Sequence, residues 1–221
     1  MLNVIYEDNH LLVVEKPVNI LSQGDNTNDD DMVNLLKKYL KEKYNKPGNV
    51  FVGLVHRLDR PVGGIMVFAK TSKAASRLSE QVRNKTFKKT YKAVIHGEMK
   101  KKQDNLSDYL YKDKKTNMVS VVNKNHKDAK DAKLSYKTLA SNNGFSLVEI
   151  DLQTGRPHQI RVQFSSRNHP LYGDQRYGKN VNKKGQQIAL WSYKIEIEHP
   201  TKKEKMEFVC EPPNKYPWNM F

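Results

Sequence analysis

The segment VHRLDRPVGG, residues 55–64, places one aspartate between two arginines and close to a histidine. Asp59 could act as a catalytic carboxylate, while the guanidinium groups of Arg57 and Arg60 hold a polyanion beside it. The proline and the two glycines that follow allow a tight loop that turns Asp59 toward a cleft. A structural turn with an ion pair between Asp59 and a neighbouring arginine is the alternative that this loop alone leaves open.

A second segment, QTGRPHQIRVQFSSRNHPLYGDQRYG at 153–178, is rich in arginine, histidine and tyrosine. Alternation predicts a strand over 160–164, with Arg161 between two apolar residues and two glutamines on the same face. A buried arginine needs a carboxylate or phosphate partner, and Asp59 is the obvious candidate. An edge strand with one solvated face is the other interpretation. The tyrosines and arginines near the end of the segment are typical of sites where bases stack and phosphates bind.

A third segment, KKTYKAVIHGE at 88–98, reads as a strand with Tyr91 among lysines. The ring of Tyr91 could stack on a base, although a half-buried strand tyrosine is the more ordinary reading. The histidines lack the spacing of metal ligands, and the glycine patterns of nucleotide-binding loops are absent from the sequence. The acidic run Asp29–Asp31 is interpreted as solvated charge at a helix start. We therefore expect neither a metal nor a nucleotide cofactor.

Composition supports a nucleic-acid partner. Residues 1–50 hold 6 Lys and 8 Asp or Glu, whereas residues 51–221 hold 33 Lys or Arg and 16 Asp or Glu. This asymmetry suggests a basic face for a polyanion, and a solvated lysine-rich surface is the alternative. The single cysteine, Cys210, excludes an intrachain disulfide, and no apolar run is long enough to span a membrane. The start of the sequence is unlike a signal peptide, so a cytoplasmic location is expected.

The elements that must position these residues follow from periodicity and turn signals. Helical spacing predicts a helix from Met32 through Leu40 and another from Thr71 or Ser72 to Asn84. Strands are predicted at 3–7, 11–16, 51–54, 65–70, 88–98, 134–140, 145–152, 160–164, 193–198 and 205–210. Residues 99–133 are expected to form an exposed, partly mobile insertion with short strands. Because few strands are joined by a helix, an α+β fold around a largely antiparallel sheet is predicted.

Together, HRLDRPVGGIMVFAK, KKTYKAVIHGE and LQTGRPHQIRVQF resemble three motifs of the RluA-type pseudouridine synthases, in the same order and spacing. The opening NVIYEDNHLLVVEKPVNIL is similar to the start of that family's catalytic domain. The resemblance covers most of the chain. It implies the pseudouridine synthase fold, a largely antiparallel mixed sheet with flanking helices and a central RNA-binding cleft. One catalytic domain over 1–221 is expected, with two sublobes possible and without the S4 domain of many relatives.

The resemblance implies an isomerase that converts uridine in structured RNA, a stem-loop of rRNA or tRNA, into pseudouridine without a cofactor or metal. Asp59 falls on the catalytic aspartate, as nucleophile or as base toward the sugar, and both roles stay open. Arg161 falls on the basic residue that pairs with it, and Tyr91 on the tyrosine that stacks on the base. Residues predicted to contact RNA or support the cleft are His56, Arg57, Arg60, Arg156, His158 and Gln159.

One departure from the family is that Val62-Gly63-Gly64 stands where many relatives have Thr-Ser-Gly, which bears on loop rigidity more than on the reacting groups. Two other functions are considered. A non-catalytic RNA-binding protein or RNA chaperone could use the same basic cleft. A glycosidase or phosphodiesterase would need a second acid beside Asp59, for which Asp174 is the candidate. A monomer is expected, with no membrane association.

Overall fold

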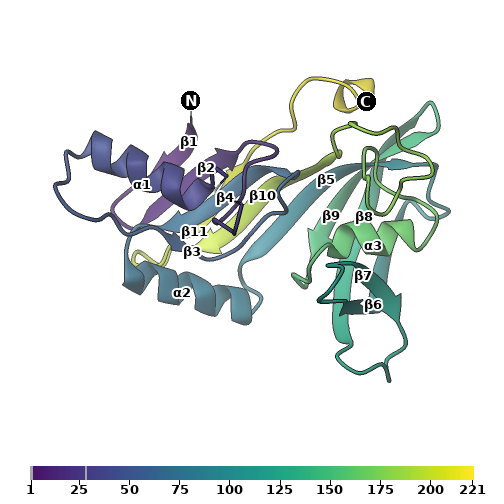
Figure 1. Cartoon of the computed structure of the whole chain (residues 1–221), viewed down its shortest axis with the longest axis horizontal. Coiled ribbons are helices and arrows are strands. Elements are labelled where there is room, and N and C mark those ends of the chain that lie inside the picture. The colour runs from purple at the N-terminus through teal and green to yellow at the C-terminus, as the bar shows by residue number, and fades with distance from the viewer. Residues whose placement is uncertain (1, 28) are drawn as a thin grey trace. The chain divides into compact units, whose positions relative to one another are not determined.

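A computed structural model describes residues 2–27 and 29–221, so the predicted loop at 22–31 is described except for residue 28. The chain divides into two compact units, Met1–Lys88 with Ser192–Glu211 and Lys89–Trp191 with Pro212–Phe221. Each unit has its own strands, helices and buried core (Figure 1). The single catalytic domain therefore stays a prediction.

The first unit is a sheet with two helices. Its strands run in the order β1, β2, β4 and β10, with β11 paired to β10 and β3 paired to β4. The bounds are β1 Asn3–Glu7, β2 Leu11–Lys16, α1 Met32–Lys43, β3 Gly53–Leu54, β4 Gly63–Ala69, α2 Ser72–Arg83, β10 Leu190–Glu198 and β11 Lys205–Val209. The predicted strands at 3–7 and 11–16 are confirmed, whereas the strand predicted at 51–54 is only two residues long.

Both helices of the first unit begin where helical spacing predicts, but the interpretation of Asp31 as solvated charge is wrong, because Asp31 is buried. Asp31 accepts a hydrogen bond from the backbone N–H of Asn34 and so caps α1, and Thr71 accepts from that of Ala74 and so caps α2. The central strands β2 and β4 are almost wholly buried, because they have neighbouring strands on both edges and helices against the sheet. This core holds the loop between β3 and β4, which carries Asp59.

The second unit is an antiparallel sheet in the order β5, β9, β8, β6 and β7, with one helix. The bounds are β5 Lys88–His96, β6 Gln103–Lys112, β7 Val119–Val122, β8 Lys130–Asn142, β9 Phe145–Leu152, α3 Gln159–Ser165 and a 3-10 turn at Trp218–Met220. Residues 99–133 are thus no loose insertion, because β6, β7 and the start of β8 form continuous ladders. Val162 of α3 packs on Leu110, Val119 and Ala132 from these strands.

Residues 160–164 belong to helix α3, so the predicted strand is wrong. The apolar alternation that suggested a strand is misleading, because the helix is buried on all sides from Gln159 to Phe164. The side-chain amide of Gln159 donates to that of Gln163 at 3.0 Å, a contact between positions four apart that a helix allows and a strand does not. Arg161 projects to another side, where it meets Asp174. The three residues therefore do not share a face.

Candidate active site

In the first unit, the Asp59 loop is held in place by buried polar groups. The backbone N–H of Val62 donates to the carbonyl of Asp59 at 2.9 Å, which closes a tight turn. The hydroxyl of Ser22 donates to the carbonyl of Leu58 at 2.8 Å and accepts from its N–H at 3.0 Å. Both residues are buried, so these two hydrogen bonds satisfy main-chain groups that water does not reach. The residue next to Asp59 is therefore fixed in position.

Lys16 lies beneath the same loop and has no exposed surface. Its ammonium group donates to the carbonyls of Pro17, Ile20 and Arg60, the last at 3.0 Å. Burial lowers the pKa of Lys16 to about 7, while the nearby negative charge of Asp59 acts in the opposite direction. A buried cation thus joins the segment after β2 to the turn that carries Asp59. Sequence reasoning missed Lys16 and Ser22, because each lies far along the chain from the loop.

The other predicted residues of this loop differ in exposure. His56 is buried, accepts from the N–H of Val67 at 3.0 Å and lies 5.2 Å from the ring of Phe87, which suits a supporting role. Arg57 is exposed. Arg60 is also exposed, and its guanidinium donates to the carbonyl of Asn19 and lies 2.7 Å from the carboxylate of Asp29. The loop thus presents two accessible cations on either side of Asp59.

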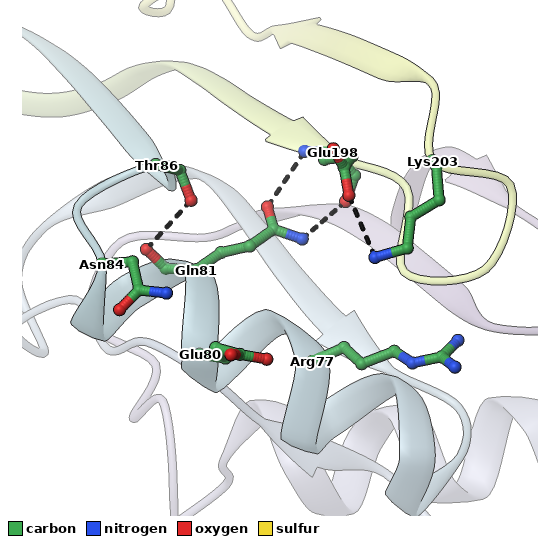
Figure 2. Close-up of a pocket in the computed structure, with 7 residues that line it drawn as sticks. All are labelled: Arg77, Glu80, Gln81, Asn84, Thr86, Glu198 and Lys203. Carbon is green, nitrogen blue, oxygen red and sulfur yellow. Dashed lines mark hydrogen bonds and ion pairs between the residues drawn. The ribbon is translucent and has the colours of Figure 1, made fainter.

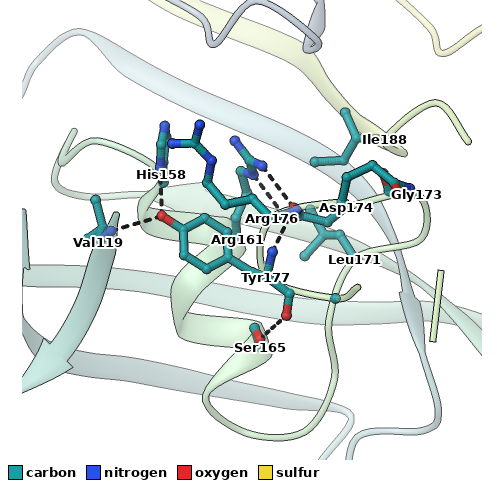
Figure 3. Close-up of polar contacts among 12 residues, drawn as sticks. Val119, His158, Arg161, Ser165, Leu171, Gly173, Asp174, Arg176, Tyr177 and Ile188 are labelled. Carbon is teal, nitrogen blue, oxygen red and sulfur yellow. Dashed lines mark hydrogen bonds and ion pairs between the residues drawn. The ribbon is translucent and has the colours of Figure 1, made fainter. Parts of the chain in front are cut away.

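In the second unit, Tyr91 lies in β5, opposite Ile150 of β9, and only 6% of its surface is exposed. Arg161 lies in α3 and forms a bidentate ion pair with Asp174, with 2.8 Å from Nε to one carboxylate oxygen and 2.8 Å from Nη2 to the other (Figure 3). Its guanidinium carbon lies 5.2 Å from the centre of the Tyr177 ring. The structure thus gives Arg161 a carboxylate partner that the sequence analysis had not paired with it.

The start of α3 and the residues before it are tied to strand β8. The guanidinium of Arg156 donates to the carbonyl of Asp131 at 2.8 Å, and the side-chain amide of the buried Gln159 donates to the backbone carbonyl of Lys133 at 3.1 Å. His158 adopts a left-handed backbone conformation with φ of 51°, and its Nδ1 lies 2.7 Å from the hydroxyl of Tyr177. These contacts place Arg156 and His158 at partly exposed positions and leave Gln159 as a support.

Asp174 is ionised in this setting. Burial by itself would raise its pKa, but the hydrogen bonds and charge of Arg161, together with the N–H groups of Tyr177 and Arg176, lower it overall. Burial also raises the pKa of the Tyr177 hydroxyl, which therefore stays protonated. A carboxylate held ionised is a poor general acid, so this arrangement disfavours the glycosidase role considered for Asp174.

A polar pocket of about 250 Å³ lies elsewhere in the first unit (Figure 2) and contains none of the predicted site residues. Its groups bond to one another: the amide of Gln81 exchanges two hydrogen bonds with the backbone of Glu198, and Lys203 pairs with the Glu198 carboxylate. Within residues 2–27 and 29–221, no group of three or more His, Cys, Asp or Glu side chains could hold a metal ion. Among the helices of the described chain, none has the length and apolar character needed to cross a membrane.

Comparison with known proteins identifies the family. The sequence profile of the RNA pseudouridylate synthases matches residues 10–166, which include Asp59, Tyr91 and Arg161. An uncharacterized RNA pseudouridine synthase of Bacillus subtilis is 34% identical over 215 residues, covering 96% of this chain and 68% of that protein. Ribosomal large subunit pseudouridine synthase D of Borreliella burgdorferi is 32% identical, covering 96% and 66%. The chain thus spans about two thirds of the length of these relatives.

Among solved structures, the human RNA pseudouridylate synthase domain containing 4 aligns with a TM-score of 0.79 at 21% identity, over 96% of this chain and 88% of that one. The human protein RNA Pseudouridylate Synthase Domain Containing 1 aligns with a TM-score of 0.76 at 23% identity. These likenesses confirm the predicted α+β pseudouridine synthase fold. The profile match and the sequence identities establish that the chain belongs to the RNA pseudouridylate synthase family, a family of isomerases.

Proposed function

We propose that this protein isomerises specific uridines of structured RNA to pseudouridine with Asp59 as the catalytic carboxylate. The observation that carries the proposal is the fixation of the Asp59 turn by the buried Ser22 and Lys16 of its own unit. A turn that only joins two strands has no need of a fully buried lysine beneath it, because burying an ammonium group is costly. A reactive carboxylate, by contrast, must be held within a fraction of an ångström.

In the proposed reaction, the N1–C1′ glycosidic bond breaks, the base rotates and a C5–C1′ bond forms. Substrate and product have the same composition, so the reaction needs no oxidant, reductant or group donor. Asp59 attacks C1′ or removes a proton from the sugar. Arg161 is the basic residue that assists Asp59, and Tyr91 stacks on the base and assists removal of the C5 proton.

RNA contacts are assigned to the accessible cations. Arg57, Arg60 and Arg156 bind phosphates, and Arg57 also fills the gap that the flipped uridine leaves in the stack. His158 contacts RNA from its partly exposed position, while His56 and Gln159 support the site from buried ones. We further propose that the two units are sublobes of one catalytic domain and that the protein works as a cytoplasmic monomer.

The relatives named as ribosomal large subunit synthases favour ribosomal RNA as the substrate, with transfer RNA as the other member of the same class. The test is pseudouridine mapping of unmodified transcripts of the host's large-subunit rRNA and tRNAs after incubation with the protein. Asp59→Asn should make no pseudouridine yet bind RNA within about twofold of wild type, since the change preserves shape. The matched control, Asp29→Asn, removes the carboxylate paired with Arg60 and should remain active.

Three outcomes would contradict the proposal. Pseudouridine formation by Asp59→Asn at the wild-type rate would exclude Asp59 as the reacting group. RNA binding without product by the wild-type protein would favour the RNA chaperone function. Free uracil or cut strands among the products would favour a hydrolase.

A further inference from the structure

Asp174 lies eight residues beyond the segment that matches the family profile, and it holds Arg161 by both of its carboxylate oxygens. The side chains of the pair are 8% and 0% exposed, so neither charge is screened by water. The two bonds engage Nε and Nη2, which fixes the plane and direction of the guanidinium. Nη1 is the nitrogen outside this fork, and its direction is set by the other two.

Asp174 is itself held by its loop. Its Oδ1 accepts from the N–H of Arg176 at 2.9 Å and of Tyr177 at 3.1 Å. The buried Asn182 organises this loop, because its amide nitrogen donates to the carbonyls of Leu171, Asp174 and Gly178. A side chain at Gly178 would lie 2.6 Å from that same amide nitrogen. The carboxylate therefore belongs to a loop with little room to shift.

Tyr177 supports the guanidinium from its face. Its ring lies against Arg161, and its hydroxyl accepts from the N–H of Val119 at 3.0 Å (Figure 3). The same hydroxyl lies 2.7 Å from Nδ1 of His158, within hydrogen-bonding distance. The carbonyl of Tyr177 accepts from the hydroxyl of Ser165 at 2.6 Å, so the residue is tied to both ends of α3. Arg161 is thus fixed in its plane by Asp174 and across its plane by Tyr177.

We propose that Asp174, backed by Tyr177, is a positioning residue that fixes the direction of the Arg161 guanidinium for the isomerisation. This inference rests on the proposed function, in which Arg161 is the basic residue that assists Asp59. An arginine has several rotatable bonds, and an unsupported one would sample many directions. Held by Asp174, the guanidinium is oriented before RNA binds, so it requires no rearrangement during the reaction.

The test compares Asp174→Asn with Asp108→Asn. Asp108 forms the matched control pair, since it accepts from both terminal nitrogens of Arg167, just beyond α3 in the same unit. We measure the single-turnover rate of pseudouridine formation on the unmodified large-subunit rRNA transcript, the RNA dissociation constant, and folding by circular dichroism. Asp174→Asn should react roughly 100-fold more slowly per folded molecule, the size expected for an ångström-scale misplacement. Its RNA affinity should stay within twofold of wild type, and Asp108→Asn should react normally.

Folded Asp174→Asn with the wild-type rate would overturn the proposal, and so would an equal loss of rate in Asp108→Asn. A purely structural role would lower the folded fraction without lowering the rate per folded molecule. Should Asp174→Asn not fold, Asp174→Glu keeps the charge but displaces the guanidinium, and a wild-type rate in that variant would overturn the proposal instead. Inactive wild-type protein, or an active Asp59→Asn, would contradict the proposed function itself and is therefore distinguishable.

Discussion

Removing the hydroxyl of Ser22 should release the loop that carries Asp59. Ser22→Ala deletes both hydrogen bonds to Leu58. The serine hydroxyl accepts from the backbone N–H of Leu58 at 3.0 Å and donates to its carbonyl at 2.8 Å. Because Leu58 and Ser22 are 7% and 5% exposed, water replaces this partner poorly. A buried main-chain group left unsatisfied costs about 1–3 kcal/mol. Because two such groups lose their partner, we expect the free energy of unfolding to fall by about 2–6 kcal/mol.

The same change should slow pseudouridine formation by roughly 10- to 100-fold, because small displacements of a reacting group have effects of this size. Urea unfolding gives the stability, single-turnover kinetics gives the rate, and amide hydrogen exchange reports whether Leu58 loses protection. Thr71→Ala serves as control, since it removes the cap of α2 in the same unit and should cost about 1 kcal/mol without changing the rate. Stability and rate both at wild-type level in Ser22→Ala would refute the reasoning.

Three further predictions concern charged groups. Burial would raise the pKa of Glu7, but hydrogen bonds from two lysines and two tyrosines lower it to about 2. The stability that Glu7 contributes is therefore present above pH 4.5 and is lost as the pH falls toward 2. Glu7→Gln should make unfolding by acid depend less on pH in that window. Because the pKa of Lys16 is lowered from 10.5 to about 7 by folding, the free energy of unfolding of the wild type should rise relative to that of Lys16→Met between pH 7 and pH 10.5. Urea unfolding at several pH values measures both free energies. A difference that does not change with pH would contradict the burial argument. Arg161→Ala should abolish turnover and cost about 3–5 kcal/mol in thermal or urea unfolding, because it leaves the buried Asp174 unpaired; an equally stable variant would show that the pair contributes little.

Local patterns predicted most elements because their determinants are local. Helical spacing marked α1 and α2, and the apolar runs of β2 and β4 marked strands. Residues 99–133 were predicted to form an exposed insertion because β6 to β8 are rich in lysine and expose one face to solvent. What stabilises them is pairing between strands and packing under α3, neither of which is visible in a short window.

The motifs identified the reactive side chains but not the groups that hold them. Ser22 lies 36 residues before Leu58, and Lys16 lies 44 residues before Arg60, so no spacing rule links them. Asp174 was noticed as a carboxylate, but the strand predicted at 160–164 gave no reason to pair it with Arg161. In the helix, Arg161 points away from Gln159 and Gln163, and that direction brings it to Asp174. The error in secondary structure therefore concealed the ion pair.

The supports of the Asp59 loop also explain why this chain can differ from many relatives after Asp59. Ser22 and Lys16 bond to main-chain atoms of Leu58 and Arg60, so the loop is fixed without help from the side chains that follow. The hydroxyls that a Thr-Ser-Gly run would supply are then dispensable for rigidity. Gly64, however, has φ of +113°, and a side chain there would lie 2.3 Å from the carbonyl of Ser192. The last position of the run is constrained, because the backbone leaves no room for a Cβ there.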